Sequence, residues 1–158
     1  MKIVTNGLSR IVFLYKDKAI KVTWINFPKL IKVFKNRKRN VDKNIFIDIF
    51  KIIWRILLAN RREYLYFKKH SNEKFLLPIN KVFLFGFITV QPKAEVCHLL
   101  DLKWQQLLQK FRKEKIHDSD LLTPENFCTH NGILKLLDYG SKRTQEELSI
   151  HGFEIFKL

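Results

Sequence analysis

Two apolar runs separated by an Asn-Gly pair, within TPENFCTHNGILKLLDYG at residues 123–140, constrain the fold of this chain more than any other feature. Asn-Gly between apolar runs is the strongest short-range pattern for a β-hairpin, because both residues tolerate the left-handed backbone of a tight turn. The stretch therefore predicts two antiparallel strands joined at Asn131 and Gly132. Asn126 precedes the first strand and Asp138 follows the second, so the hairpin would fix the separation of an amide and a carboxylate.

The N-terminal part of the chain predicts a second set of strands. Residues 10–15 (RIVFLY) and 18–24 (KAIKVTW) are apolar, rich in β-branched side chains and joined by Lys-Asp, which predicts another hairpin. Residues 80–92 predict one or two strands with a bend at Gly86, and Pro92 ends them.

A long helix is predicted from residue 44 to near Ser71. Its first part, NIFIDIFKIIWRILLAN at 44–60, is very apolar, but Asp48, Lys51 and Arg55 interrupt it on one helical face. A spanning helix needs about 20 mostly uncharged residues. Three interpretations follow: a helix packed against its own domain, a helix lying in a membrane interface, and a membrane span.

A second helix is predicted over residues 98–115, followed by a polar loop and later by a short polar helix in SKRTQEEL. Apolar residues at helical spacing in 98–115 are expected in the core: Leu100, Trp104, Leu107, Leu108 and Phe111. The order of elements predicts an α+β fold whose sheet lies mostly in the N-terminal part.

The chain of 158 residues has 30 Lys and Arg against 15 Asp and Glu, a formal net charge of +15. Such an excess implies an anionic partner, which could be nucleic acid, a membrane surface or a phosphorylated substrate. Seven basic residues lie in 29–43, a run that is either solvated or in contact with an anion. The residues expected to contact an anionic glycolipid or membrane surface are Lys29, Lys32, Lys35, Arg37, Lys38 and Arg39.

Cys97 and Cys128 are the only cysteines, and they form no CxxC pair. A thiolate metal site and a disulfide framework are therefore not expected. A reducing compartment is expected instead. The first ten residues lack the long apolar run of a secretory signal. These features predict a cytoplasmic protein, with peripheral attachment to the inner face of the membrane as a further expectation.

Four short segments resemble, in order, the protein-kinase-like superfamily. They are AIKV with Lys21 on a strand, RREYLYF with Glu63 on the following helix, HDSDLLTPEN ending in Asn126, and LLDYG with Asp138. The resemblance covers roughly residues 5–143. It implies an antiparallel N-lobe sheet over 1–92 with a helical insertion at 25–71, and an abbreviated helical C-lobe over 93–158.

The resemblance also implies a site for ATP and Mg²⁺. Lys21 would contact the phosphates and Glu63 would hold it in place, while Asn126 and Asp138 would supply oxygen ligands to the metal ion. The glycine-rich phosphate cover of the family is reduced here to Gly7, the one glycine before the first predicted strand.

The catalytic carboxylate does not match the family pattern directly. The family's catalytic Asp lies five residues before the Asn, where this chain has Leu121. Asp120 lies six residues before Asn126, and a one-residue insertion in the loop would make it the general base. Asp118 lies eight before, and His117 is an alternative base.

The segments around these residues indicate a branch of the family. Lys21 and Glu63 are 42 residues apart, a long separation that contains the basic run and the apolar helix. This is similar to small bacterial kinases of the lipopolysaccharide core, heptose kinases in particular. Only 18 residues follow Gly140, so a minimal kinase is expected.

The leading hypothesis is an ATP-dependent phosphotransferase that phosphorylates a lipopolysaccharide core sugar. One alternative is a pseudokinase or nucleotide-binding regulatory module, and another is a small Ser/Thr protein kinase of phage or effector type. A nucleic-acid binder outside the superfamily is supported only by the net charge.

Overall fold

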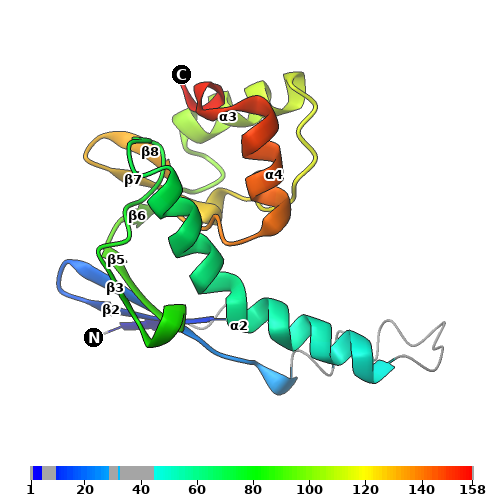
Figure 1. Cartoon of the computed structure of the whole chain (residues 1–158). Helices are drawn as coiled ribbons and strands as arrows, with labels where there is room; N and C mark the ends of the chain where they lie inside the picture. The colour runs from blue at the N-terminus through cyan, green and yellow to red at the C-terminus, as the bar shows by residue number, and fades with distance from the viewer. Residues whose placement is uncertain (1, 5–9, 29–31, 33–44, 158) are drawn as a thin grey trace.

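The computed structural model describes residues 2–4, 10–28, 32 and 45–157. They form an α+β fold with two antiparallel sheets, as predicted, and long helix α2 runs between the larger sheet and the C-terminal helices (Figure 1). The larger sheet has the order β1-β2-β3-β5-β4, and its strands are β1 (Lys2–Val4), β2 (Arg10–Tyr15), β3 (Lys18–Thr23), β4 (Lys81–Phe83) and β5 (Ile88–Pro92). The smaller sheet has the order β6-β7-β8, with β6 (Glu95–Val96), β7 (Phe127–His130) and β8 (Ile133–Leu136).

Both predicted hairpins are confirmed. In the first, Tyr15 pairs with Lys18, so a two-residue turn joins β2 to β3, and its first residue Lys16 has a φ of 50°. In the second, Asn131 and Gly132 join β7 to β8 with φ values of 53° and 74°. Positive φ at both turn residues matches the twist of the flanking strands, which is why Asn-Gly predicts this turn.

The predicted bend at Gly86 is also confirmed. A short 3-10 helix, η1 (Leu84–Gly86), separates β4 from β5. Gly86 has a φ of 103°, and a Cβ atom there would lie 2.6 Å from the Cβ of Arg61 on α2. Only glycine therefore allows the turn to pack this closely on the helix.

Helix α2 (Ile45–Lys69) is one continuous helix, as predicted. Ile56, Asn60 and Glu63 recur at helical spacing on its buried face. Phe50 and Trp54 are exposed, and their rings stack with centroids 6.3 Å apart. Within the described residues, no helix has the combined length and apolarity needed to cross a bilayer.

Helix α3 (Leu102–Lys113) begins later than predicted. The backbone N–H of His98 donates to Asp101 Oδ2 at 2.8 Å, which forms a turn instead of a first helical turn. Leu100 lies in this turn and is 88% exposed, so its expected place in the core was wrong. Trp104, Leu107 and Phe111 are buried as expected.

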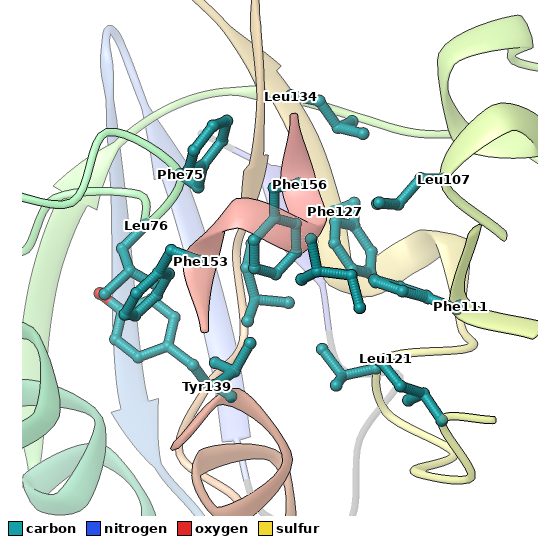
Figure 2. Packing of buried hydrophobic residues seen from close by; sticks show 14 of the residues in the cluster. Phe75, Leu76, Leu107, Phe111, Leu121, Phe127, Leu134, Tyr139, Phe153 and Phe156 are labelled. Carbon is teal, nitrogen blue, oxygen red and sulfur yellow. The ribbon is translucent and has the colours of Figure 1, made fainter. Parts of the chain in front are cut away.

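The main hydrophobic core is built mostly from the C-terminal half of the chain and is rich in aromatic rings (Figure 2). Helix α4 (Lys142–His151) and the short helix η3 (Phe153–Phe156) close it, and Phe127 of β7 packs against Trp104 with ring centroids 4.9 Å apart. Phe127 and Leu136 are fully buried. The core therefore holds the β7–β8 hairpin in a fixed position, and with it the residues at the hairpin's two ends.

The segment after α2 also joins the hairpin. The N–H of Leu77 donates to Leu136 O at 3.0 Å, and the N–H of Leu136 donates to Phe75 O at 2.8 Å. These two bonds couple the end of β8 to the chain that leads from α2 into β4. The β8 end of the hairpin is thus attached to the chain that follows α2.

Candidate functional site

A buried ion pair lies between the larger sheet and α2. Lys21 on β3 is 4% exposed and Glu63 on α2 is fully buried, and Lys21 Nζ lies 2.7 Å from Glu63 Oε1. Gln91 on the neighbouring strand β5 donates to the same oxygen at 3.1 Å. Buried charges are rare unless they are paired and hydrogen-bonded, and this pair meets both conditions. The structure therefore brings together the two residues that the sequence analysis paired across 42 positions.

Lys21 also connects this pair to the end of the hairpin. Its Nζ donates a hydrogen bond of 2.8 Å to the carbonyl oxygen of Leu137. Leu137 is the residue directly before Asp138. The ammonium group thus has one partner on the helix and one on the hairpin. Any movement of Lys21 would break contacts to both.

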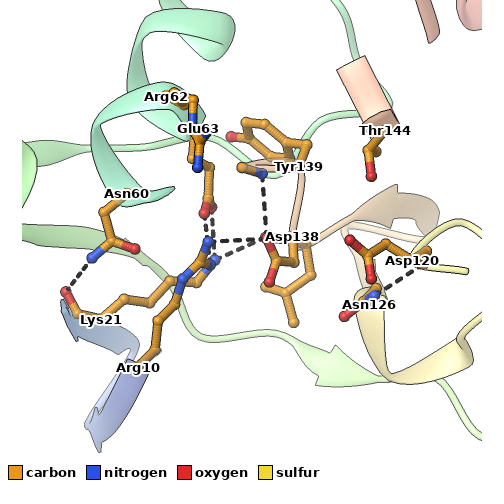
Figure 3. Close-up of polar contacts among 12 residues, drawn as sticks. Arg10, Lys21, Asn60, Arg62, Glu63, Asp120, Asn126, Asp138, Tyr139 and Thr144 are labelled. Atoms are coloured by element: carbon orange, nitrogen blue, oxygen red, sulfur yellow. Dashed lines mark hydrogen bonds and ion pairs between the residues drawn. The ribbon is translucent and has the colours of Figure 1, made fainter. Parts of the chain in front are cut away.

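Asn126 and Asp138 lie side by side at the open end of the hairpin. The N–H of Leu137 donates to Asn126 O at 2.7 Å, which extends the β7–β8 pairing by one step. The Asn126 amide nitrogen donates to Asp120 O at 2.9 Å, and no contact among the described residues uses its side-chain oxygen. Figure 3 shows Asn126 and Asp120 facing Asp138. The predicted neighbourhood of the amide and the carboxylate is therefore present.

Arg10 is a site residue that the sequence analysis missed. Its Nη1 lies 2.7 Å from Glu63 Oε2 and its Nη2 lies 3.1 Å from Asp138 Oδ1, so one guanidinium bridges two carboxylates (Figure 3). The side chain is only 11% exposed. Its buried Nε has no hydrogen-bond partner among the described residues. An unpaired buried donor costs about 1–3 kcal/mol, so an additional acceptor oxygen beside it would be stabilising.

The alternation of side chains between the two faces of the β2–β3 hairpin places Arg10 near Lys21. The two-residue turn pairs Val12 with Lys21 and Leu14 with Ala19. Because side chains two apart share a face, Arg10 lies one step beyond Val12 on the face of Lys21. The sequence therefore contained the information to find Arg10 once the hairpin register was known.

The charges of this cluster balance. Burial raises the pKa of Asp138, but Arg10 and Lys21 outweigh this effect and hold the pKa below its usual value. Burial likewise lowers the pKa of Arg10, and Asp138 and Glu63 more than reverse it. Both pKa directions therefore favour the charged forms of Arg10 and Asp138.

A cavity of about 440 Å³ opens beside this cluster. Its lining includes the charged and polar residues Arg10, Lys21, Glu125, Asn126 and Asp138. The rest of the lining is apolar, namely Val4, Val12, Leu14, Ala19, Pro92, Ala94, Val96 and Leu137. A ligand with an apolar planar part and an anionic part matches this mixed lining, and the volume is within the range of small-molecule sites.

The three candidate bases in the preceding loop differ in their surroundings. Asp118 is buried, and its Oδ2 accepts a hydrogen bond of 2.5 Å from the Thr144 hydroxyl, so it ties the loop to α4. His117 is exposed, and its backbone oxygen accepts a hydrogen bond from Arg143. Asp120 is half-buried beside Asn126.

Asp120 is the candidate whose chemistry suits a base. Burial, then the negative charges of Asp118 and Asp138, raise its pKa above the usual value. A raised carboxyl pKa brings the group closer to the working pH and makes it a better proton acceptor.

Asn126 and Asp138 are also the residues that could hold a metal ion. The described residues contain no group of three or more His, Cys, Asp or Glu side chains that could bind one. Mg²⁺ is commonly bound through one or two protein oxygens together with substrate phosphates, so a larger group is not required. The contacts of Asp138 among the described residues use only Oδ1, so Oδ2 and the Asn126 amide oxygen suit this ion.

Some predicted contacts lie outside the described residues. These are Gly7 and five members of the basic run, Lys29, Lys35, Arg37, Lys38 and Arg39. Lys32 is described and exposed.

Comparisons of the chain with protein-family models, with curated proteins and with solved structures found no match.

Proposed function

We propose that this chain is an ATP-dependent phosphotransferase of the protein-kinase-like superfamily. The proposal depends on one observation: Lys21 contacts both Glu63 and the backbone oxygen of Leu137. These contacts join α2, β3 and the β7–β8 hairpin at one cavity. In protein kinases a Lys on the third strand pairs with a helix Glu, and an Asn and an Asp hold magnesium. Lys21, Glu63, Asn126 and Asp138 are arranged in a way that suits these roles.

The mixed lining of the cavity suits the two parts of ATP. Apolar side chains of β2, β3 and residues 92–96 would receive the adenine ring, and Lys21 would contact the phosphates. Asn126 and Asp138 would hold Mg²⁺, which neutralises phosphate charge when it is bound. Asp120 would accept the proton of the acceptor hydroxyl.

Mg-ATP is expected to raise the thermal unfolding midpoint. A ligand at about 100 times its dissociation constant stabilises a fold by roughly 2.7 kcal/mol. For a domain of this size, that corresponds to a shift of about 5–10 °C. Differential scanning fluorimetry with and without Mg-ATP measures it.

Asp138→Asn is the matched variant for this measurement. Asparagine keeps the shape of the side chain and an acceptor for Arg10, but it removes the charge that would bind the metal. We expect it to lose most of the shift. An unchanged midpoint of the wild-type protein over a wide range of Mg-ATP concentrations would rule out the proposed nucleotide site.

For the acceptor, we propose a sugar hydroxyl of an anionic glycolipid at the cytoplasmic face of the inner membrane. The support is the net charge of +15 together with an exposed surface of α2 that combines Phe50 and Trp54 with Lys51 and Arg55. Aromatic and basic side chains together favour the interface of an anionic bilayer.

The acceptor is tested by incubating the protein with γ-labelled Mg-ATP and lipopolysaccharide whose core lacks phosphate. We expect label in the glycolipid and little in the protein itself. Autophosphorylation without glycolipid labelling would favour the small protein-kinase alternative. Labelling of neither, with ATP still bound, would contradict both acceptors.

A nucleotide-binding module without transfer activity is the second candidate. The specific observation in its favour is the ion pair between Arg10 and Asp138, because it occupies one oxygen of the carboxylate that would hold the metal. The spacing of Asp120 from Asn126, one residue longer than in the family, also favours it. Replacement of Asp120 separates the two candidates.

A further inference from the structure

Arg10 lines the cavity at the place where β2 begins. It shares a face with Val12 and Leu14, which line the same cavity. Its guanidinium lies between Glu63 and Asp138, next to the site of Lys21 (Figure 3). A guanidinium therefore lies beside Lys21, where the phosphates of the proposed nucleotide would lie.

The contacts of Arg10 leave it free to exchange one partner. Its two terminal nitrogens bind two different carboxylates, so neither pair has the bidentate geometry in which guanidinium–carboxylate pairs are strongest. The contact to Asp138 is the longer one, at 3.1 Å against 2.7 Å for Glu63. Asp138 Oδ1 also accepts the N–H of Gly140, so this carboxylate keeps a partner if Arg10 leaves it.

The surrounding backbone is shaped to fit the guanidinium. A Cβ atom at Gly140 would lie 2.8 Å from Arg10 Nη2 and 2.7 Å from the backbone oxygen of Ala59. Only glycine therefore allows the chain after Asp138 to pass between α2 and Arg10. The buried Nε of Arg10, which has no partner among the described residues, remains as a further donor.

We propose that Arg10 is a phosphate-binding residue, which exchanges Asp138 for a nucleotide phosphate oxygen while Glu63 continues to hold it. This inference rests on the proposed function and adds a residue to it. The chain has a single glycine, Gly7, before the first strand of the predicted hairpin, so few flexible backbone N–H groups are available to cover phosphates. The guanidinium of Arg10 supplies donors in the fork geometry that suits phosphate.

The experiment compares the affinities of adenosine, ADP and ATP, each with Mg²⁺, for the wild-type protein and for Arg10→Met. Loss of charge-assisted hydrogen bonds to phosphate is expected to lower the affinity for ADP and for ATP by at least about 10-fold. Adenosine has no phosphate, so its affinity is expected to change by less than about twofold. Arg112→Met is the matched control, because Arg112 is exposed on α3, and it is expected to change none of the three affinities.

An equal loss of affinity for all three ligands would overturn the inference, because it would show that Arg10 only supports the fold. Unchanged or tighter ATP binding would also overturn it, since Arg10 would then merely compete with the nucleotide. If Arg10→Met does not fold, Arg10→Lys keeps a cation but loses the fork, and the same selective loss of ADP and ATP affinity is expected.

Lys21→Met separates this inference from the proposed function. If Lys21→Met weakens ATP binding and Arg10→Met does not, only the role of Arg10 is wrong. If the wild-type protein binds no adenine nucleotide, the proposed function itself fails.

Discussion

Glu63→Ala is expected to destabilise the fold by about 3–5 kcal/mol, the range found when one partner of a buried ion pair is removed. Glu63 is fully buried and contacts both Lys21 and Arg10, which lie at 2.7 Å from its two oxygens. Its removal leaves Lys21 and Arg10 buried without the carboxylate that contacts both of them, and Arg10 keeps its contact with Asp138. Urea denaturation followed by circular dichroism measures the loss.

Glu146→Ala is the matched control. Glu146 pairs with Lys142 one turn earlier on α4, at 3.2 Å, and both side chains are more than half exposed. Exposed pairs of this kind contribute about 0.3–0.5 kcal/mol, so a small change is expected. If Glu63→Ala destabilised the protein no more than Glu146→Ala, the contacts of Glu63 with Lys21 and Arg10 would not stabilise the fold.

Local patterns predicted the elements that carry the site. The Asn-Gly turn, the alternation in residues 10–15 and the helical spacing after residue 44 each depend on neighbours within a few positions. The hairpin register then fixed the neighbourhood of Asn126 and Asp138. These parts were predictable because short-range geometry alone determines them.

The remaining features depend on contacts between distant segments. The two contacts of Arg10 reach 53 and 128 positions along the chain, and no local pattern specifies them. The late start of α3 depends on the Asp101 side chain, which closes a turn with His98. Asp118 and Asp120 have the same chemistry in the sequence, and it is the burial of Asp118 and its hydrogen bond from Thr144 that distinguish it as structural.

Asp120→Asn is expected to lower the turnover number by about 10²–10⁴-fold, the usual contribution of general acid–base catalysis. Asparagine keeps the size and the backbone contact to Asn126, so ATP affinity is expected to be unchanged. Single-turnover transfer from Mg-ATP to the acceptor measures the effect. Because the deprotonated carboxylate is the base, wild-type turnover is also expected to fall as the pH decreases through the raised pKa of Asp120, above 3.8.

Two further variants decide whether this loss is specific. Asp17→Asn removes an exposed carboxylate in the β2–β3 turn, and its turnover is expected to equal that of the wild-type protein. Asp118→Asn weakens the link to Thr144, so it is expected to lower the unfolding midpoint more than the turnover of the folded protein. If Asp120→Asn kept full turnover, Asp120 would have no catalytic role. If the wild-type protein bound ATP but transferred no phosphate, Asp120 would again have no catalytic role, and the cluster of Arg10, Lys21, Glu63 and Asp138 would serve nucleotide binding alone.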